Sequence, residues 1–145
     1  MKTLFLLLFS LLLSAQMLEV GEKVQSVALT SQHDQEIKLT ENGFWIIGWD
    51  KETTALANEY FYKHKIKKDQ NMIVDVSQIP SGIFSMFVAP KMQRFSHPIL
   101  LSYDEAYNLT LPYKDGYVTL LKLQDATIEA IYFVETQEEL EKLLK

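Results

Sequence analysis

The side chains that could carry out chemistry in this 145-residue chain do not include a cysteine. Disulfides, thiolate metal sites, thiol redox chemistry and cysteine nucleophiles are therefore excluded. The three histidines, His33, His64 and His97, lie far apart in the sequence, and none has a second histidine within four residues. A metal site would need them to converge with carboxylates in space. We interpret them as scattered surface or loop histidines, and we expect no metal and no cofactor.

The remaining polar residues give weak signals for catalysis. Ser96 precedes His97, but sequence neighbours rarely meet in triad geometry, and no strained Gly-x-Ser-x-Gly turn is present. Asn108 begins an Asn-Leu-Thr pattern that resembles a glycosylation acceptor but is frequent by chance. The formal charge of -5 argues against nucleic acid or an anionic membrane as partner, because those partners need a basic face.

One short segment is a candidate binding turn. It consists of Trp49, Asp50, Lys51, Glu52, Thr53 and Thr54. The turn follows a continuous apolar run, and open α/β sheets build ligand sites at the carboxyl ends of such strands. An aromatic side chain with polar neighbours could bind a peptide or a small molecule there, and a core tryptophan followed by a helix N-cap is the alternative. Because the turn is acidic and lacks glycine, we expect no nucleotide or flavin.

The elements around this turn follow from hydrophobic patterning. The run at 44–49 predicts a strand buried on both faces, and 72–76 predicts a second one after an intervening helix. We expect further strands at 24–29, 37–39, 99–102, 117–123 and 127–134, with helices at 104–109 and after Thr136. The segment 77–95 is ambiguous: four apolar residues fit one helical face, but Pro90 would break or kink the helix. The four residues are Ile83, Phe84, Phe87 and Val88. The order of elements predicts an α/β domain with a mixed central sheet, flanking helices and an N-terminal β-hairpin.

The first fifteen residues have the pattern of a secretory signal peptide. Lys2 precedes ten residues, 4–13, in which only Ser10 is not apolar, and the small pair Ser14 and Ala15 follows. A spanning helix needs roughly 20 apolar residues, although a retained membrane anchor is the alternative. We therefore expect a signal peptide at 1–15, one domain at 16–145 and a periplasmic location. Contact with a membrane is expected only through an uncleaved signal peptide.

Several segments resemble thioredoxin-like domains of the peroxiredoxin or TlpA subtype. Residues 20–29 are similar to the opening of that superfamily, 44–50 to the strand that leads to its active-site helix, and 97–109 to a later strand and helix. Residues 79–88 are similar to a segment of the exported, cysteine-poor YtfJ-type proteins. The resemblance implies a three-layer thioredoxin-like fold over nearly all of the mature chain.

The chain departs from that family at the residues that carry its chemistry. Where thioredoxins have Trp-Cys-x-x-Cys, this chain has the candidate binding turn, and a peroxiredoxin Thr-x-x-Cys would require a cysteine at Leu56 or Ala57. The family's cis-proline has no match, since residues 116–118 are Gly-Tyr-Val. The resemblance thus implies a thioredoxin fold without thiol-disulfide oxidoreductase or peroxidase activity.

Three functions remain open from the sequence. The first is a redox-inactive accessory domain that binds an exported protein or a peptide in the bacterial periplasm. The second is an enzyme that uses non-thiol groups of the former active-site cleft, with Asp50, Glu52 and Thr53 as candidates. The third is a structural subunit of an envelope complex. Two of those three residues meeting a histidine in a pocket would favour the enzyme.

Overall fold

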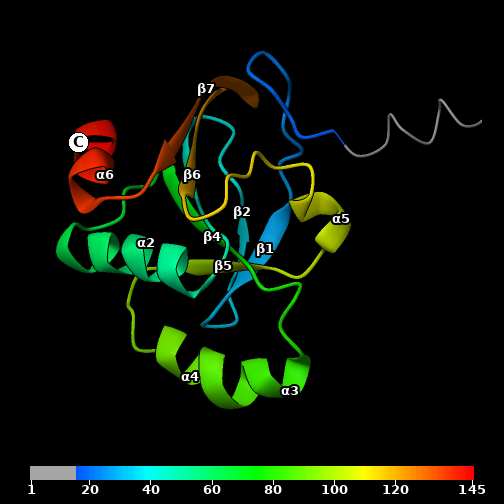
Figure 1. Cartoon of the computed structure of the whole chain (residues 1–145), viewed down its shortest axis with the longest axis vertical. Coiled ribbons are helices and arrows are strands. Elements are labelled where there is room, and N and C mark those ends of the chain that lie inside the picture. The colour runs from blue at the N-terminus through cyan, green and yellow to red at the C-terminus, as the bar shows by residue number, and fades with distance from the viewer. Residues whose placement is uncertain (1–15) are drawn as a thin grey trace, which may run out of the picture.

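The computed structural model describes residues 16–145, so the predicted signal peptide lies outside the described residues. These residues form a seven-stranded mixed sheet with the strand order β2-β1-β5-β4-β3-β6-β7 (Figure 1). Its strands are β1 (Ala28–Ser31), β2 (Glu36–Lys38), β3 (Gly43–Gly48), β4 (Gln70–Asp75), β5 (Ile99–Ser102), β6 (Val118–Gln124) and β7 (Thr127–Val134). The predicted α/β fold with a mixed sheet and an N-terminal hairpin is confirmed.

The central strand β3 is buried on both faces, as its continuous apolar run predicts. Trp45 and Ile47 pack on one face of the sheet and Ile46 on the other, and all three side chains are buried. β3 pairs in parallel with β4 and antiparallel with β6. The helix α2 (Lys51–Lys63) connects β3 to β4, which gives the expected β-α-β unit.

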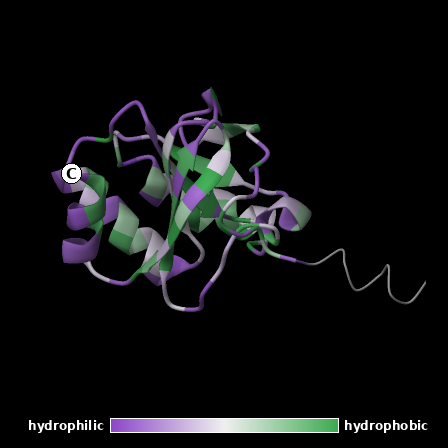
Figure 2. Cartoon of the chain, turned by 90° about the horizontal axis from the view of Figure 1, so that it is seen from above, coloured by the Kyte–Doolittle hydropathy of each residue, from purple (hydrophilic) through white to green (hydrophobic). Residues whose placement is uncertain are grey.

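Helices cover the two faces unequally. α2 and α6 (Gln137–Leu144) pack on the Ile46 side, whereas α5 (Glu105–Asn108) and the chain before β1 cover the Trp45 side. Figure 2 shows the hydrophobic residues concentrated in the sheet, with hydrophilic residues along the outer surface of the C-terminal helix. Both faces of the sheet are thus closed by amphipathic elements.

The first strand of the hairpin begins later than predicted. Residues 24–29 were expected to be extended and paired with 37–39, but β1 starts at Ala28. Val24 instead donates its backbone N–H to the oxygen of Ala126 at 2.8 Å, next to the β6–β7 turn. The reason is that residues 22–24 pair with residues 126–128 at the far edge of the sheet before the chain reaches β1.

The ambiguous stretch 77–95 is helical through Pro90. It consists of α3 (Ser81–Ile83), a π-helical turn η2 (Phe84–Val88) and α4 (Ala89–Met92), which we call the α3–α4 segment. Pro90 lies in the first turn of α4, where its missing N–H is tolerated. The four apolar residues that fit one helical face are divided in the structure: Ile83 and Phe87 are exposed, whereas Phe84 and Val88 pack against the core.

Gly43 is a position where the fold depends on a missing side chain. Its φ is +120°, and a Cβ there would lie 2.0 Å from the backbone oxygen of Asp69. We expect Gly43→Ala to lower the free energy of unfolding by at least about 2 kcal/mol, because strain and a backbone clash add. Urea denaturation measures this. Gly82→Ala is the control, since its Cβ would meet nothing within 4 Å, and an equal loss in both variants would contradict the assignment.

Candidate functional site

The turn after β3 is closed by reciprocal hydrogen bonds between Asp50 and Thr53. The Asp50 carboxylate accepts from the Thr53 backbone N–H and from the Thr53 hydroxyl, each at 2.8 Å. The Thr53 oxygen in turn accepts from the backbone N–H of Asp50 at 3.1 Å and of Trp49 at 2.8 Å. This is a capping box that starts α2. Both side chains are therefore engaged in holding the turn.

Trp49 and Gly48 fix how closely the turn sits on the sheet. The indole Nε1–H of Trp49 donates to the Thr119 hydroxyl at 2.9 Å, and its ring meets Tyr113 edge-on at 5.1 Å. A Cβ on Gly48 would lie 2.7 Å from the Thr54 hydroxyl, so the glycine lets α2 approach β3. Trp49 is thus a half-buried residue anchored on β6.

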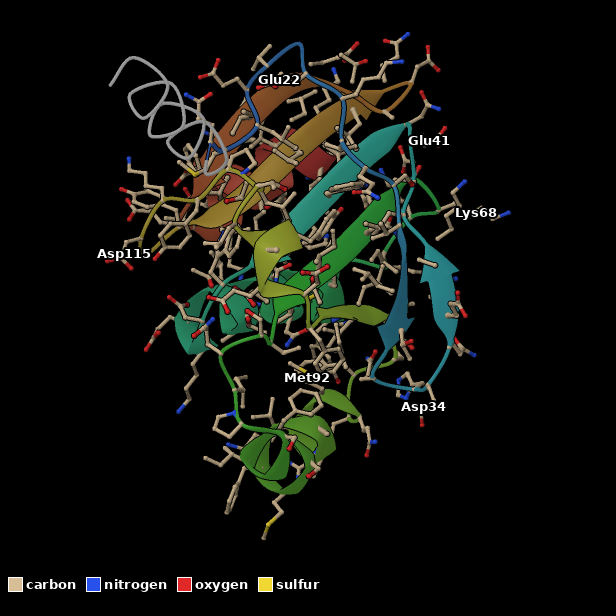
Figure 3. The ribbon with its side chains drawn as sticks, turned by 90° about the vertical axis from the view of Figure 1, so that its right-hand side faces the viewer. Glu22, Asp34, Glu41, Lys68, Met92 and Asp115 are labelled. Atoms are coloured by element: carbon tan, nitrogen blue, oxygen red, sulfur yellow. The ribbon has the colours of Figure 1, made fainter. Side chains whose placement is uncertain are left out.

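A cavity of about 850 Å³ opens beside this turn. It lies between α2, the carboxyl ends of β3 and β4, and the α3–α4 segment. Figure 3 shows that segment beyond the ends of the strands, with Met92 on its side toward the sheet. The cavity is lined by Trp49, Asp50, Lys51, Thr54, Ala55, Asn58, Glu59, Tyr62, Val74, Asp75, Gln78, Ile79, Phe87, Val88, Lys91, Met92 and Phe95. The walls of the cavity are mainly aliphatic and aromatic.

The cavity includes part of the candidate binding turn. Trp49, Asp50, Lys51 and Thr54 line it, whereas Glu52 and Thr53 do not. The lining residues from the other walls were not predicted from the sequence. One of them had a usable signal: Asp75 ends β4, and the carboxyl ends of neighbouring parallel strands meet at one edge of a sheet.

The carboxylates around the cavity already have partners within the protein. Asp75 accepts from the Ser77 hydroxyl at 2.6 Å and from the Asn108 amide at 2.8 Å. Glu59 pairs with Lys63 at 3.1 Å. Within residues 16–145, no buried side-chain nitrogen or oxygen lacks a hydrogen-bond partner. The carboxylates of the cavity therefore serve the fold, and its free surface is largely apolar.

The Asn-Leu-Thr pattern belongs to the same hydrogen-bond network. Asn108 is buried, and its amide nitrogen also donates to the backbone oxygen of Ser102 at 3.2 Å. The Ser102 hydroxyl donates to the Asn108 side-chain oxygen. In the folded domain this asparagine is a structural residue that joins α5 to the ends of β4 and β5.

Comparison with solved structures identifies the architecture. StoA from Bacillus subtilis aligns with a TM-score of 0.59 and 13% identity over 83% of this chain and 97% of its own. The thioredoxin domain of a thiol-disulfide oxidoreductase from Bacteroides vulgatus aligns at 0.57 and 12%, over 88% and 99%. A peroxiredoxin-like protein from Aquifex aeolicus aligns at 0.53 and 7%, over 88% of each chain. The chain has a thioredoxin-like fold.

At these identities the likeness establishes the fold alone. No protein-family model and no curated protein sequence matches the chain. Since the chain has no cysteine, this thioredoxin-like domain cannot perform thiol redox chemistry. No helix within residues 16–145 combines the length and the apolar character needed to cross a membrane.

The three histidines of the thioredoxin-like domain do not form one cluster, although His33 lies near His97. His64 stacks on Tyr60, and the His33 ring lies 2.9 Å from the backbone oxygen of Phe95. His97 lies in a loop, as expected, but it is 5% exposed rather than at the surface. No cluster of three histidine or carboxylate side chains in the described part of the chain could hold a metal ion.

His97 connects the floor of the cavity to the loop before β5. Its Nε2 lies 2.8 Å from the side-chain oxygen of Asn58, which can only accept, so Nε2 carries the proton. Phe61 and Phe95 flank the ring. Burial, and to a lesser degree the nearby His33, lowers the pKa of His97 to about 4. His97 is therefore neutral in the folded domain at neutral pH.

The capping role of Asp50 predicts a specific loss of stability. We expect Asp50→Ala to lower the free energy of unfolding by about 1–2 kcal/mol, because the Thr53 N–H loses its acceptor, and Asp50→Asn to restore most of it. Glu52→Ala, in the same exposed turn, changes stability by less than about 0.5 kcal/mol. Urea denaturation of the three variants measures this. Equal losses in Asp50→Ala and Glu52→Ala would contradict the cap.

The lowered pKa of His97 predicts a loss of stability in acid. Between the unfolded pKa of 6.5 and the folded value of about 4, the unfolded chain binds a proton that the folded domain does not. Stability should therefore fall as the pH drops through this window, by roughly 3 kcal/mol. The free energy of unfolding of the wild type and of His97→Gln is measured by urea denaturation at several pH values, and each protein is compared with its own value at pH 7.5. In His97→Gln, the decrease between pH 6.5 and pH 4 should disappear. Identical slopes in both proteins would refute the assignment.

Proposed function

We propose that this is an exported, redox-inactive thioredoxin-like domain that binds an apolar peptide segment of another exported protein. The observation that carries the proposal is the 850 Å³ cavity beside the Trp49 turn. Ligand sites commonly have volumes of about 300–1,000 Å³ and mainly apolar walls with a few polar groups. The location at the carboxyl ends of β3 and β4 also supports a binding site.

Two exposed aromatic side chains at the cavity support a peptide rather than a small polar molecule as the ligand. Tyr62 on α2 and Phe87 on the α3–α4 segment line the cavity from facing walls, and they are 79% and 61% exposed. Exposed aromatic side chains are enriched where one protein recognises another. Lys51, Gln78 and Lys91 add hydrogen-bond donors for the carbonyl groups of a bound peptide.

The geometry favours binding over the alternative of a non-thiol enzyme. Asp50 and Thr53 hydrogen-bond to each other in the capping box, and Glu52 lies outside the cavity. None of the described residues that line the cavity is a histidine. None of the three candidate residues, Asp50, Glu52 and Thr53, therefore meets a histidine in the cavity. A periplasmic location and a kinship with YtfJ-type proteins remain parts of the proposal.

Ala55 offers a direct test because it lies on the exposed cavity side of α2. We expect Ala55→Trp to fill the mouth of the cavity and to weaken the binding of apolar 12-residue peptides at least tenfold. Glu52→Trp is the matched control, since it adds the same ring to the same helix outside the cavity. Fluorescence anisotropy of labelled peptides from an apolar library measures the affinities.

Two results would reject the proposal. One is a wild-type domain that binds no member of the peptide library. The other is a peptide that binds equally to the wild type and to Ala55→Trp, because such a peptide occupies another surface. Urea denaturation of both tryptophan variants confirms that they are folded.

A further inference from the structure

The α3–α4 segment is apolar on the side that faces away from the domain. Ile83, Met86 and Phe87 are 50%, 69% and 61% exposed, and their spacing of three and four residues places them on one helical face. On the inner side, Phe84 and Val88 pack against the core. A helix that is apolar all round is normally buried. The described residues provide no cover for this outer face.

The stretch of sequence that contains the outer face has a charge opposite in sign to that of the whole chain. The sequence carries 19 acidic residues, yet none lies between Asp75 and Asp104. This stretch contains Lys91 and Arg94, which are exposed and form no ion pair within residues 16–145. The only histidine in the stretch, His97, is buried and neutral. The outer face is therefore a cluster of large apolar side chains in a stretch that carries two cations, Arg94 and Lys91, of which Lys91 also lines the cavity.

The position of the segment makes the outer face accessible to an extended surface. Figures 1 and 3 show the α3–α4 segment at one end of the molecule, beyond the carboxyl ends of the central strands and away from the β6–β7 hairpin. Ser85, within this face, donates its hydroxyl to the backbone oxygen of Ser81 at 3.0 Å. The hydroxyl thus has an internal partner and needs none from a polar environment.

We propose that the outer face of the α3–α4 segment inserts into the headgroup region of an anionic lipid bilayer. Interfacial helices combine large apolar side chains, which enter the boundary of the acyl region, with lysine and arginine beside anionic headgroups. The whole-chain charge predicted no anionic membrane as partner, but that charge averages over the acidic remainder of the domain. This proposal goes beyond peptide binding and does not depend on an occupant of the cavity.

Sedimentation with lipid vesicles tests the insertion. At low salt we expect the domain, residues 16–145, to bind vesicles that contain phosphatidylglycerol and to bind pure phosphatidylcholine vesicles at least tenfold more weakly. Ile83→Ser combined with Met86→Ser should weaken binding at least tenfold and leaves Phe87, which lines the cavity, unchanged. Lys91→Gln combined with Arg94→Gln should weaken it roughly 25-fold, at about fivefold for each charge.

Matched controls separate this surface from general charge and hydrophobicity. Lys65→Gln with Lys68→Gln removes two exposed cations, and Leu109→Ser removes a side chain that is 66% exposed, both outside the segment. We expect both controls to bind vesicles as the wild type does. Urea denaturation of every variant confirms folding.

Three outcomes would overturn the proposal. The first is equal binding of the domain to both vesicle types, and the second is equal vesicle binding by the segment variants and the controls. The third is a dimer, detected by light scattering, that dissociates in the variant with Ile83→Ser and Met86→Ser. Such a dimer would assign the outer face to a second copy of the chain. Ala55→Trp should keep full vesicle binding. A failure of peptide binding and a failure of membrane binding are therefore distinguishable.

Discussion

Three consecutive side chains of β3, Trp45, Ile46 and Ile47, point alternately to the two faces of the sheet and are all buried. This burial requires a cover on each face. α2 supplies one as it leaves β3, and α5 with the chain before β1 supplies the other. The turn between β3 and α2 must therefore lie at the carboxyl edge of the sheet. The cavity opens at that edge because α2 and the α3–α4 segment border it from separate walls.

The parts of the fold that the sequence predicts are those specified by local signals. The short, continuous apolar run of β3 predicts a strand that is buried on both faces. The N-cap of α2 follows from the position of Asp50 at the start of the helix. The α3–α4 segment was ambiguous because both of its sides carry apolar residues. Periodicity shows which residues share a face, but not which face meets the core. The π-helical turn also shifts the register before Pro90.

The candidate site was partly predictable for a related reason. The position of the Trp49 turn follows from a topological rule that needs only the order of strands and helices. The opposite walls of the cavity come from residues distant in sequence, such as Tyr62 and Phe87, which only the folded chain brings together. The N-terminus of α2, which in thioredoxins would stabilise a thiolate, is occupied by the Asp50 carboxylate.

The two proposed surfaces share one element. The inner side of the α3–α4 segment forms a wall of the cavity, and its outer side carries the exposed cluster. At its C-terminal end the segment is tied to the hairpin by Gln32, whose amide nitrogen donates to the backbone oxygens of Met92 and Phe95 at 3.4 and 3.3 Å. Phe87 is exposed and also lines the cavity, so it is the one side chain of the exposed cluster that belongs to both surfaces.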